Sequence, residues 1–236
     1  MVLLQSTEFS SGAGLDIHIR TTRVDKAKVG YSYISGVAVK LGSDILEVMD
    51  DGMLIVNGTP VSNPVNFAGY PISKTFKGTH KNIVIYDLDV TAEKAISKPI
   101  QIRVNTNAGM IFVDITGRFS DSAGLLGPAS YDKRMLARDG VTDLLGEWNS
   151  FGEEWQVRSN EPKLFQENRA PQYPQGCSYE SNTSTNVRRR LSMDSGVTTK
   201  DAEAACAGSK GRSKEFCIAD VMATGMVDIA QDEFYL

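Results

Sequence analysis

The chain has 236 residues, of which 41% are hydrophobic, so it can bury the core of one domain with an appended segment. Its formal net charge of -4 offers no basic field, which argues against nucleic acid or an anionic membrane surface as a partner. No apolar run approaches the roughly 20 residues that span a bilayer, so the sequence predicts no membrane insertion by this segment. The first residues also lack the basic and apolar regions of a signal peptide.

Residues 2 to 157 repeatedly alternate apolar and polar side chains, a pattern typical of β-strands. Asp51-Gly52 and Asn57-Gly58 separate some of these segments, and both pairs tolerate the positive φ that tight hairpin turns need. The expected fold is therefore mainly β, an antiparallel β-sandwich-like meander with its alternate apolar residues turned inward. The clearest predicted strands are residues 15–19, 37–41, 45–48, 53–56, 83–88, 100–104 and 110–116.

The composition changes after Trp155. Residues 158–197 contain three prolines, many Asn, Ser and Gln residues and the run Arg188-Arg189-Arg190, and they are predicted to form an extended polar linker. Residues 198–236 are predicted to form a small α-helical tail. The sequence thus divides into a β domain at 1–157, a linker at 158–197 and a tail at 198–236.

The tail contains two cysteines and three predicted helices. Thr198 precedes an acidic, Ala-rich stretch, which predicts a helix over 202–207, and further helices are expected at 213–223 and 227–234. Cys206 and Cys217 lie eleven positions apart, so two short helices that fold back could bring their sulfurs within bonding distance.

A Cys206–Cys217 disulfide is the preferred interpretation, and two buried reduced thiols are the alternative. Cys177 in the linker could stay free, pair with a region missing from this sequence or exchange into the pair, and the spacing does not settle the connectivity. Three cysteines with two distant histidines show no recognised zinc-ligand spacing.

Several motifs between Ile111 and Val157 occur in an order that identifies a resemblance. They are an alternating strand, G-L-L-G at 124–127, R-D-G at 138–140 and F-G-E-E-W-Q-V at 151–157. In this order they resemble the core of a von Willebrand factor type D (VWD) domain. The turn V-N-G-T-P-V at 56–61 and the run D-V-M-A-T-G at 220–225 extend the resemblance over most of the chain. The family's opening segment is missing, so a fragment of a larger protein is expected.

The resemblance implies a strand at 151–157 and a loop that binds calcium after G-L-L-G. In the family, Asn and Asp oxygens of that loop form a hard-cation site. Here residues 128–131 read Pro-Ala-Ser-Tyr, and Leu126 stands where the family usually has Cys. The nearby carboxylates are Asp121, Asp132 and Asp139, interleaved with basic residues. We therefore expect neither a calcium site nor a cofactor.

Catalysis has little support in the sequence. His18 lies in an alternating strand pattern and His80 in a predicted turn, and neither stands in a triad or elbow context. Glu153 and Glu154 would face opposite sides of the predicted strand, which argues against a joint acid/base role. The chain is therefore expected not to be an enzyme.

Two N-x-S/T sequences could accept a glycan. Asn57 is explained by its predicted turn, whereas Asn182 lies in the polar linker and is the better acceptor.

The leading hypothesis is a non-catalytic, extracellular or secreted VWD-type module, or part of the ectodomain of a larger membrane protein. It would act in adhesion, matrix assembly or protein–protein interaction, with extracellular proteins or other modules of its parent chain as partners. The alternative is an accessory domain of a larger secreted enzyme whose catalytic region lies outside this sequence.

Overall fold

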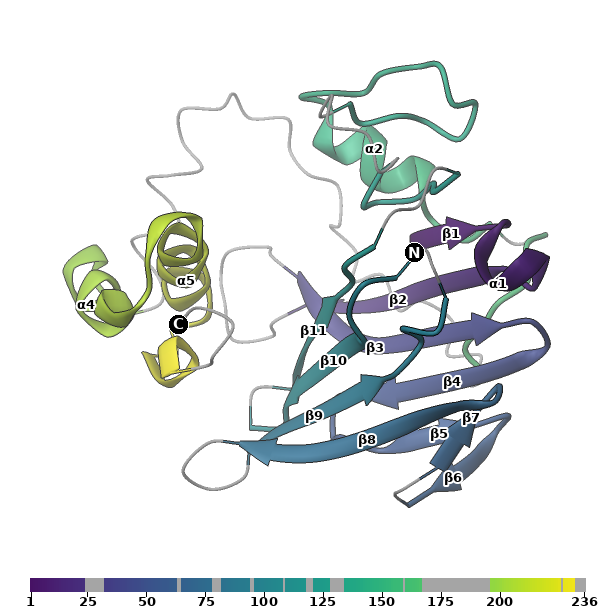
Figure 1. Ribbon diagram of the computed structural model, residues 1–236. Helices are drawn as coiled ribbons and strands as arrows, with labels where there is room; N and C mark the ends of the chain where they lie inside the picture. The colour runs from purple at the N-terminus through teal and green to yellow at the C-terminus, as the bar shows by residue number, and fades with distance from the viewer. Residues whose placement is uncertain are drawn as a thin grey trace. The chain divides into compact units, whose positions relative to one another are not determined.

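A computed structural model of the chain forms two compact units (Figure 1). Unit 1 comprises Met1–Thr21 and Ile34–Ala170, and unit 2 comprises Thr22–Tyr33 and Pro171–Leu236. The structure describes residues 1–23, 32–62, 65–77, 82–93, 96–107, 109–117, 121–127, 134–158, 160–166, 196–225 and 227–231.

Sheet A has six strands in the order β1-β2-β3-β4-β5-β6, so each strand lies beside its sequence neighbour. This meander is the topology that the short Gly-containing turns predict. A short helix, α1 (Phe9–Gly12), connects the first two strands. The strands are β1 (Val2–Ser6), β2 (Leu15–Arg23), β3 (Ser32–Leu41), β4 (Asp44–Met49), β5 (Leu54–Val56) and β6 (Thr59–Val61).

Sheet B has five strands in the order β11-β10-β9-β8-β7. The β9–β10 pairing, with Ile102 opposite Tyr86, and the β10–β11 pairing, with Ile102 opposite Val113, are both antiparallel. The strands are β7 (Val65–Phe67), β8 (Tyr70–Lys77), β9 (Ile83–Leu88), β10 (Ile100–Asn105) and β11 (Met110–Asp114).

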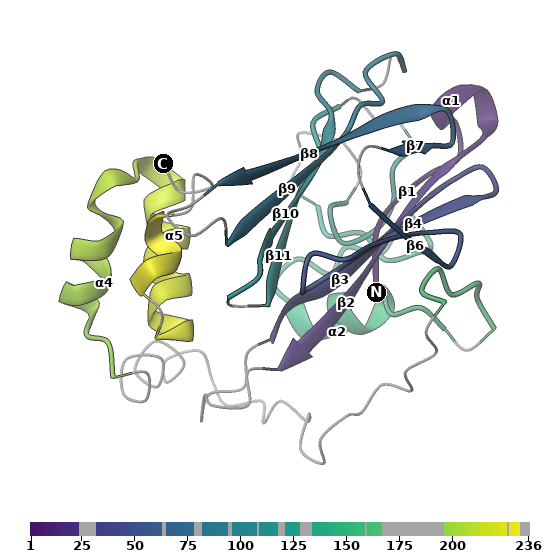
Figure 2. The same cartoon turned by 90° about the horizontal axis from the view of Figure 1, so that it is seen from below.

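The two sheets are stacked as layers, and the core lies between them (Figure 2). Alternate strand residues supply the core, as Val37 and Val39 of β3 do from sheet A and Ile100 and Ile102 of β10 do from sheet B. The hydroxyl of buried Tyr86 donates a hydrogen bond to the carbonyl oxygen of Gly52 at 2.6 Å. The prediction of a mainly β fold with antiparallel sheets is confirmed.

The segment expected to form a closing strand at residues 151–157 is instead largely helical. Helix α2 (Trp148–Glu154) ends with Trp155 as its C-cap residue, and the amide of Trp155 bonds to the carbonyl of Phe151 at 3.3 Å. Phe151 and Trp155 are four residues apart, so both can occupy the same face of a helix. Both are buried. The prediction of a strand here was wrong because the aromatic spacing fits a helix as well as a strand.

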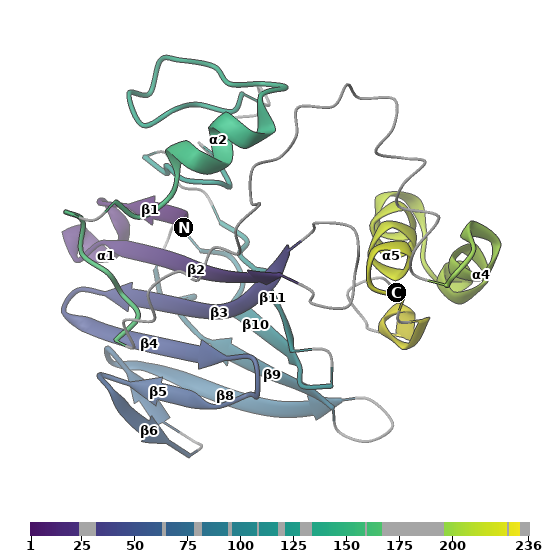
Figure 3. The same ribbon diagram turned by 180° about the vertical axis from the view of Figure 1, so that it is seen from behind.

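Unit 2 contains the predicted helical tail. Its elements are α4 (Thr199–Ala205), the 3-10 helix η1 (Cys206–Gly208), α5 (Gly211–Thr224) and the 3-10 helix η2 (Val227–Gln231) (Figure 3). Thr198 caps α4 through a capping box, in which Asp201 and Thr198 each bond to the other's amide. Gly225 ends α5 with φ of 71°. None of the described helices is long and apolar enough to cross a membrane.

Candidate functional site

The G-L-L-G loop lies along the outer edge of β1, the first strand of sheet A. The amides of Leu125 and Leu126 donate to the carbonyl oxygens of Val2 and Leu3 at 3.2 and 3.1 Å. An edge strand otherwise presents unpaired backbone groups that invite pairing with another chain. The loop therefore completes sheet A at this edge.

Gly124 allows the loop to approach β1 this closely. Its φ is 130°, and a Cβ atom built on it would lie 2.5 Å from the carbonyl oxygen of Leu3. No side chain larger than a hydrogen atom fits at that distance. The first glycine of the motif is thus required by a backbone contact.

Asp121, one of the expected calcium candidates, ties the same loop to the end of β1. Its carboxylate accepts hydrogen bonds from the hydroxyl of Ser6 at 2.7 Å and from the amides of Thr7 and Glu8 at 2.6 and 3.0 Å. Burial alone would raise the pKa of Asp121, but these hydrogen bonds outweigh it and lower that pKa to about 2. The carboxylate is therefore ionised and engaged in fixing the loop.

The R-D-G motif forms the turn of a short hairpin at residues 135–144. The amide of Ala137 bonds to the carbonyl of Thr142 at 2.9 Å, and Asp139 accepts bonds from the amides of Val141 and Thr142 at 2.9 and 2.8 Å. Hydrogen bonds from Thr142 and Val141 hold the pKa of Asp139 below its usual value. Both described calcium candidates thus have their oxygens directed to protein donors. The third, Asp132, lies outside the described residues.

Arg138 of the R-D-G motif joins the hairpin to helix α2 and the chain that follows it. Its guanidinium donates to the carbonyl oxygens of Glu154 and Gln156 at 2.7 and 2.8 Å and forms an ion pair with Glu161 at 2.5 Å. The guanidinium carbon also lies 5.1 Å from the centroid of the Trp155 ring. One planar cation therefore holds three segments together.

Trp155 anchors this region to β1. Its carbonyl accepts a 2.8 Å hydrogen bond from the amide of Val2, and its indole nitrogen donates to the carbonyl of Leu136 at 3.1 Å. Val2, Phe151 and Trp155 form a small buried cluster of their own. We call residues 121–127 and 134–158 the loop region, which this cluster and Arg138 fix to the edge of sheet A.

Two of the four residues considered for catalysis, His18 and Glu154, have contacts or burial that give them a structural role. His18 is buried in β2, and burial, with smaller electrostatic contributions, lowers its pKa to about 4. Glu154 lies at the end of α2, where its carboxylate accepts the amide hydrogen of Arg138, and Glu153 is exposed. The expected strand geometry for these two acids is thus replaced by a helix terminus. His80 lies outside the described residues.

The described residues hold no group of three or more His, Cys, Asp or Glu side chains that could bind a metal ion. Of the two candidate glycan acceptors, Asn57 has both side-chain atoms in use, since it accepts from the amide of Ile45 and donates to Asp44, each at 2.8 Å. Asn182 lies outside the described residues.

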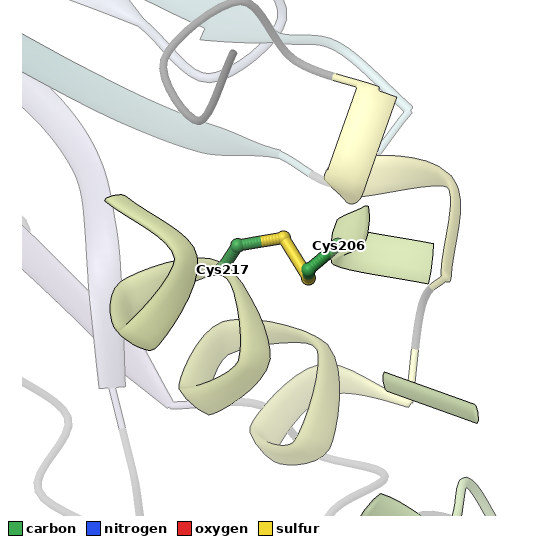
Figure 4. The surroundings of a disulfide bond; sticks show 2 residues. All are labelled: Cys206 and Cys217. Atoms are coloured by element: carbon green, nitrogen blue, oxygen red, sulfur yellow. A yellow bond between two sulfur atoms is a disulfide. The ribbon is translucent and has the colours of Figure 1, made fainter. Parts of the chain in front are cut away.

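Unit 2 contains the predicted disulfide. Cys206 and Cys217 are bonded, with their Cα atoms 5.9 Å apart, and both are fully buried (Figure 4). The bond links the 3-10 helix η1 to α5, which agrees with two short helices folding back on each other. Cys177 lies outside the described residues.

Comparison with known proteins adds no family assignment: no family model matches the sequence, and no curated protein matches it significantly.

Sequence reasoning missed the structural role of Arg138, which it treated only as a charge unfavourable to calcium. Its main ionic partner, Glu161, is 23 positions away, and nothing in the local pattern links the two. The available signal was an arginine next to an Asp-Gly turn, shortly before a tryptophan that offers a ring for stacking.

Proposed function

We propose that this chain is a non-catalytic module similar to von Willebrand factor type D domains and that it acts outside the cell in adhesion, matrix assembly or protein–protein recognition. The motifs behind the resemblance support this proposal because each has a structural task. G-L-L-G covers β1, R-D-G turns a hairpin, and Phe151 and Trp155 anchor α2. These residues fix the loop region to the edge of sheet A.

One observation carries the recognition part of the proposal. The loop region exposes three large apolar side chains, Leu126, Val141 and Leu145, which are 54%, 80% and 61% exposed. Binding residues often lie on loops that a rigid scaffold positions. We infer that the loop region contacts extracellular proteins or other modules of the same parent chain.

The disulfide supports the extracellular part of the proposal. Structural disulfides form and persist in oxidising compartments and are rare where thiols are kept reduced. Peptide mapping without reduction, on protein from its native source, should show Cys206 linked to Cys217. Finding both thiols free in that material would contradict extracellular residence.

A surface-retention assay tests recognition by the loop region. Surfaces coated with the protein should retain cells or purified matrix proteins, and a variant with Leu126→Asp, Val141→Asp and Leu145→Asp should lose this retention. Phe216→Asp is the matched control, because Phe216 is 57% exposed but lies in unit 2. Equal retention by both variants, or none by the wild-type protein, would contradict the proposal.

A further inference from the structure

Residues 160–166, which follow the loop region, lie on the outer face of sheet A, the face turned away from the core. We call these residues the strap. They contact β2, β3 and β4 and then the turn between β5 and β6. Neither sheet includes them. Figure 3 shows the green segment that follows α2 passing the strands of sheet A. The strap therefore crosses the strands as a separate layer.

Phe165 of the strap lies on β3 at a position that has no side chain. A Cβ atom built on Gly36 would lie only 3.2 Å from Cε1 of the Phe165 ring, so the ring packs directly on the strand backbone. The guanidinium carbon of Arg20 in β2 lies 4.4 Å from the centroid of the same ring, which is a cation–π distance. The outer face thus holds an aromatic side chain by both shape and charge.

The next residue of the strap is held through its backbone. The amide of Gln166 donates a 3.3 Å hydrogen bond to the carboxylate of Glu47 in β4. Glu47 is only 2% exposed, and it lies on the outer face because its neighbours Leu46 and Val48 belong to the core. A carboxylate that accepts a backbone amide can hold a peptide whatever side chain that residue carries. The Gln166 side chain ends against Gly58 in the β5–β6 turn.

These contacts have the composition of a ligand site. The outer face of an antiparallel sheet commonly carries polar side chains that face water. Here β3 contributes Gly36 and Ala38 to the outer face, and Glu47 lies opposite Ala38. Arg20 lies beside Gly36, since its Cβ is 3.5 Å from the built Cβ of Gly36. An apolar floor with a few placed polar groups is typical of sites that bind and orient a ligand.

We propose that the outer face of sheet A is a binding site for an extended peptide in which an aromatic residue follows an apolar one, and that the strap is its internal ligand. Leu164, which is 3% exposed, and Phe165 supply this pair in the chain itself. A partner segment with the same pair would make the same contacts once the strap leaves. The site is distinct from the exposed side chains of the loop region, so it does not depend on their role in recognition.

The strap can open while sheet A stays folded. β3 and β4 pair with each other along residues 36–41 and 44–49, and that ladder does not involve the strap. The strap is held by the contacts of Phe165 and Gln166 and, near its start, by the ion pair between Glu161 and Arg138. Segments held in this way open at a lower free energy than the strands of a core. The site is therefore covered by contacts that the chain can release.

Binding of a synthetic peptide tests the site. The probe is the fluorescein-labelled, amidated heptapeptide N-E-P-K-L-F-Q, which has the sequence of the strap. The full chain with Leu164→Asp and Phe165→Ser should release its own strap. This released variant should bind the probe at least roughly tenfold more tightly than the wild-type chain in fluorescence anisotropy, because the wild-type site is mostly occupied. The control peptide N-E-P-K-D-S-Q should not bind.

Gly36→Val places the bound peptide. The added side chain fills the position of the aromatic ring, so in the released variant it should weaken probe binding at least roughly tenfold. Ser73→Val, at an exposed position of β8 in sheet B, is the matched control and should leave probe binding unchanged. Hydrogen exchange followed by mass spectrometry tests displacement, because excess probe should increase exchange in the strap of the wild-type chain.

The tryptophan unfolding transition shows whether each variant is folded, and Phe165→Ala alone replaces the double variant if that one does not fold. A folded released variant that binds no probe would overturn the proposal. So would probe binding that is indifferent to Gly36→Val, or exchange in the wild-type strap that excess probe leaves unchanged.

Discussion

Replacing Gly124 by alanine should force the G-L-L-G loop away from β1. On the present backbone the added Cβ would lie 2.5 Å from the oxygen and 2.8 Å from the carbonyl carbon of Leu3. Both atoms belong to the backbone, so no side-chain rotation relieves the overlap. The φ of 130° adds strain, because L side chains rarely adopt this conformation.

The expected loss of stability has two components. A backbone held in a disfavoured conformation costs about 1–3 kcal/mol. Moving the loop also breaks the hydrogen bonds from Leu125 and Leu126 to β1, each with a net contribution of about 1 kcal/mol. Gly124→Ala should therefore lower the free energy of unfolding of unit 1 by about 3–5 kcal/mol.

Gly140→Ala is the matched control. Gly140 also has a positive φ of 71°, but a Cβ there would meet nothing within 4 Å. Only backbone strain, about 1–2 kcal/mol in the free energy of unfolding, is therefore expected. Urea unfolding followed by tryptophan fluorescence measures both variants, since Trp148 and Trp155 are the chain's two tryptophans and both lie in unit 1. Equal losses in the two variants would refute the role assigned to the close approach to β1.

Three other predictions concern metal, the disulfide and pH. Calcium or a chelator should barely change the melting temperature, because Asp121 and Asp139 already accept hydrogen bonds from the protein. A calcium-dependent rise of several degrees in the melting temperature would contradict this prediction. Cys217→Ser should destabilise unit 2 by up to about 3 kcal/mol in circular dichroism melts and leave the tryptophan fluorescence transition of unit 1 unchanged. Loss of both transitions would contradict the prediction that the disulfide stabilises unit 2 alone. Because burial lowers the pKa of His18 from 6.5 to about 4, the unfolded chain binds the extra proton between these values. The contribution of neutral His18 to the free energy of unfolding is therefore complete above pH 6.5 and is lost as the pH falls toward 4. His18→Gln should reduce the slope of the free energy of unfolding against pH in that window. An unchanged slope would exclude His18 as its source.

Strands were predictable where alternation and turn chemistry agreed. The segment Ile83–Leu88 forms β9 with the expected bounds, and Asn57 and Gly58 adopt the positive φ that their hairpin needs. β8 was not predicted, because Pro71 and its two lysines make the segment resemble a loop. Its place in sheet B is set by the pairing with β9, which the local sequence does not encode.

The candidate site was less predictable than the fold because tertiary contacts decide it. In α2, Phe151 and Trp155 satisfy both a period of two and a spacing of four, so periodicity could not choose between strand and helix. The choice depends on Arg138 and Leu136, which bond to the end of α2 from the neighbouring hairpin. The disulfide was predictable because both cysteines lie in one short segment whose helices are local.

The hydrogen bonds of the G-L-L-G loop and of Trp155 to β1 also fix the order in which the chain can complete sheet A during synthesis. β1 emerges before the loop and the Trp155 carbonyl that satisfy its outer edge, which follow about 120 to 150 residues later, a delay of roughly 6 to 30 s at ordinary elongation rates. Until then the first strand presents apolar side chains and an open backbone edge to the surrounding solution. A ribosome stalled before residue 155 would therefore hold a nascent chain that chaperones bind, and release of the chain beyond that point would remove their binding site.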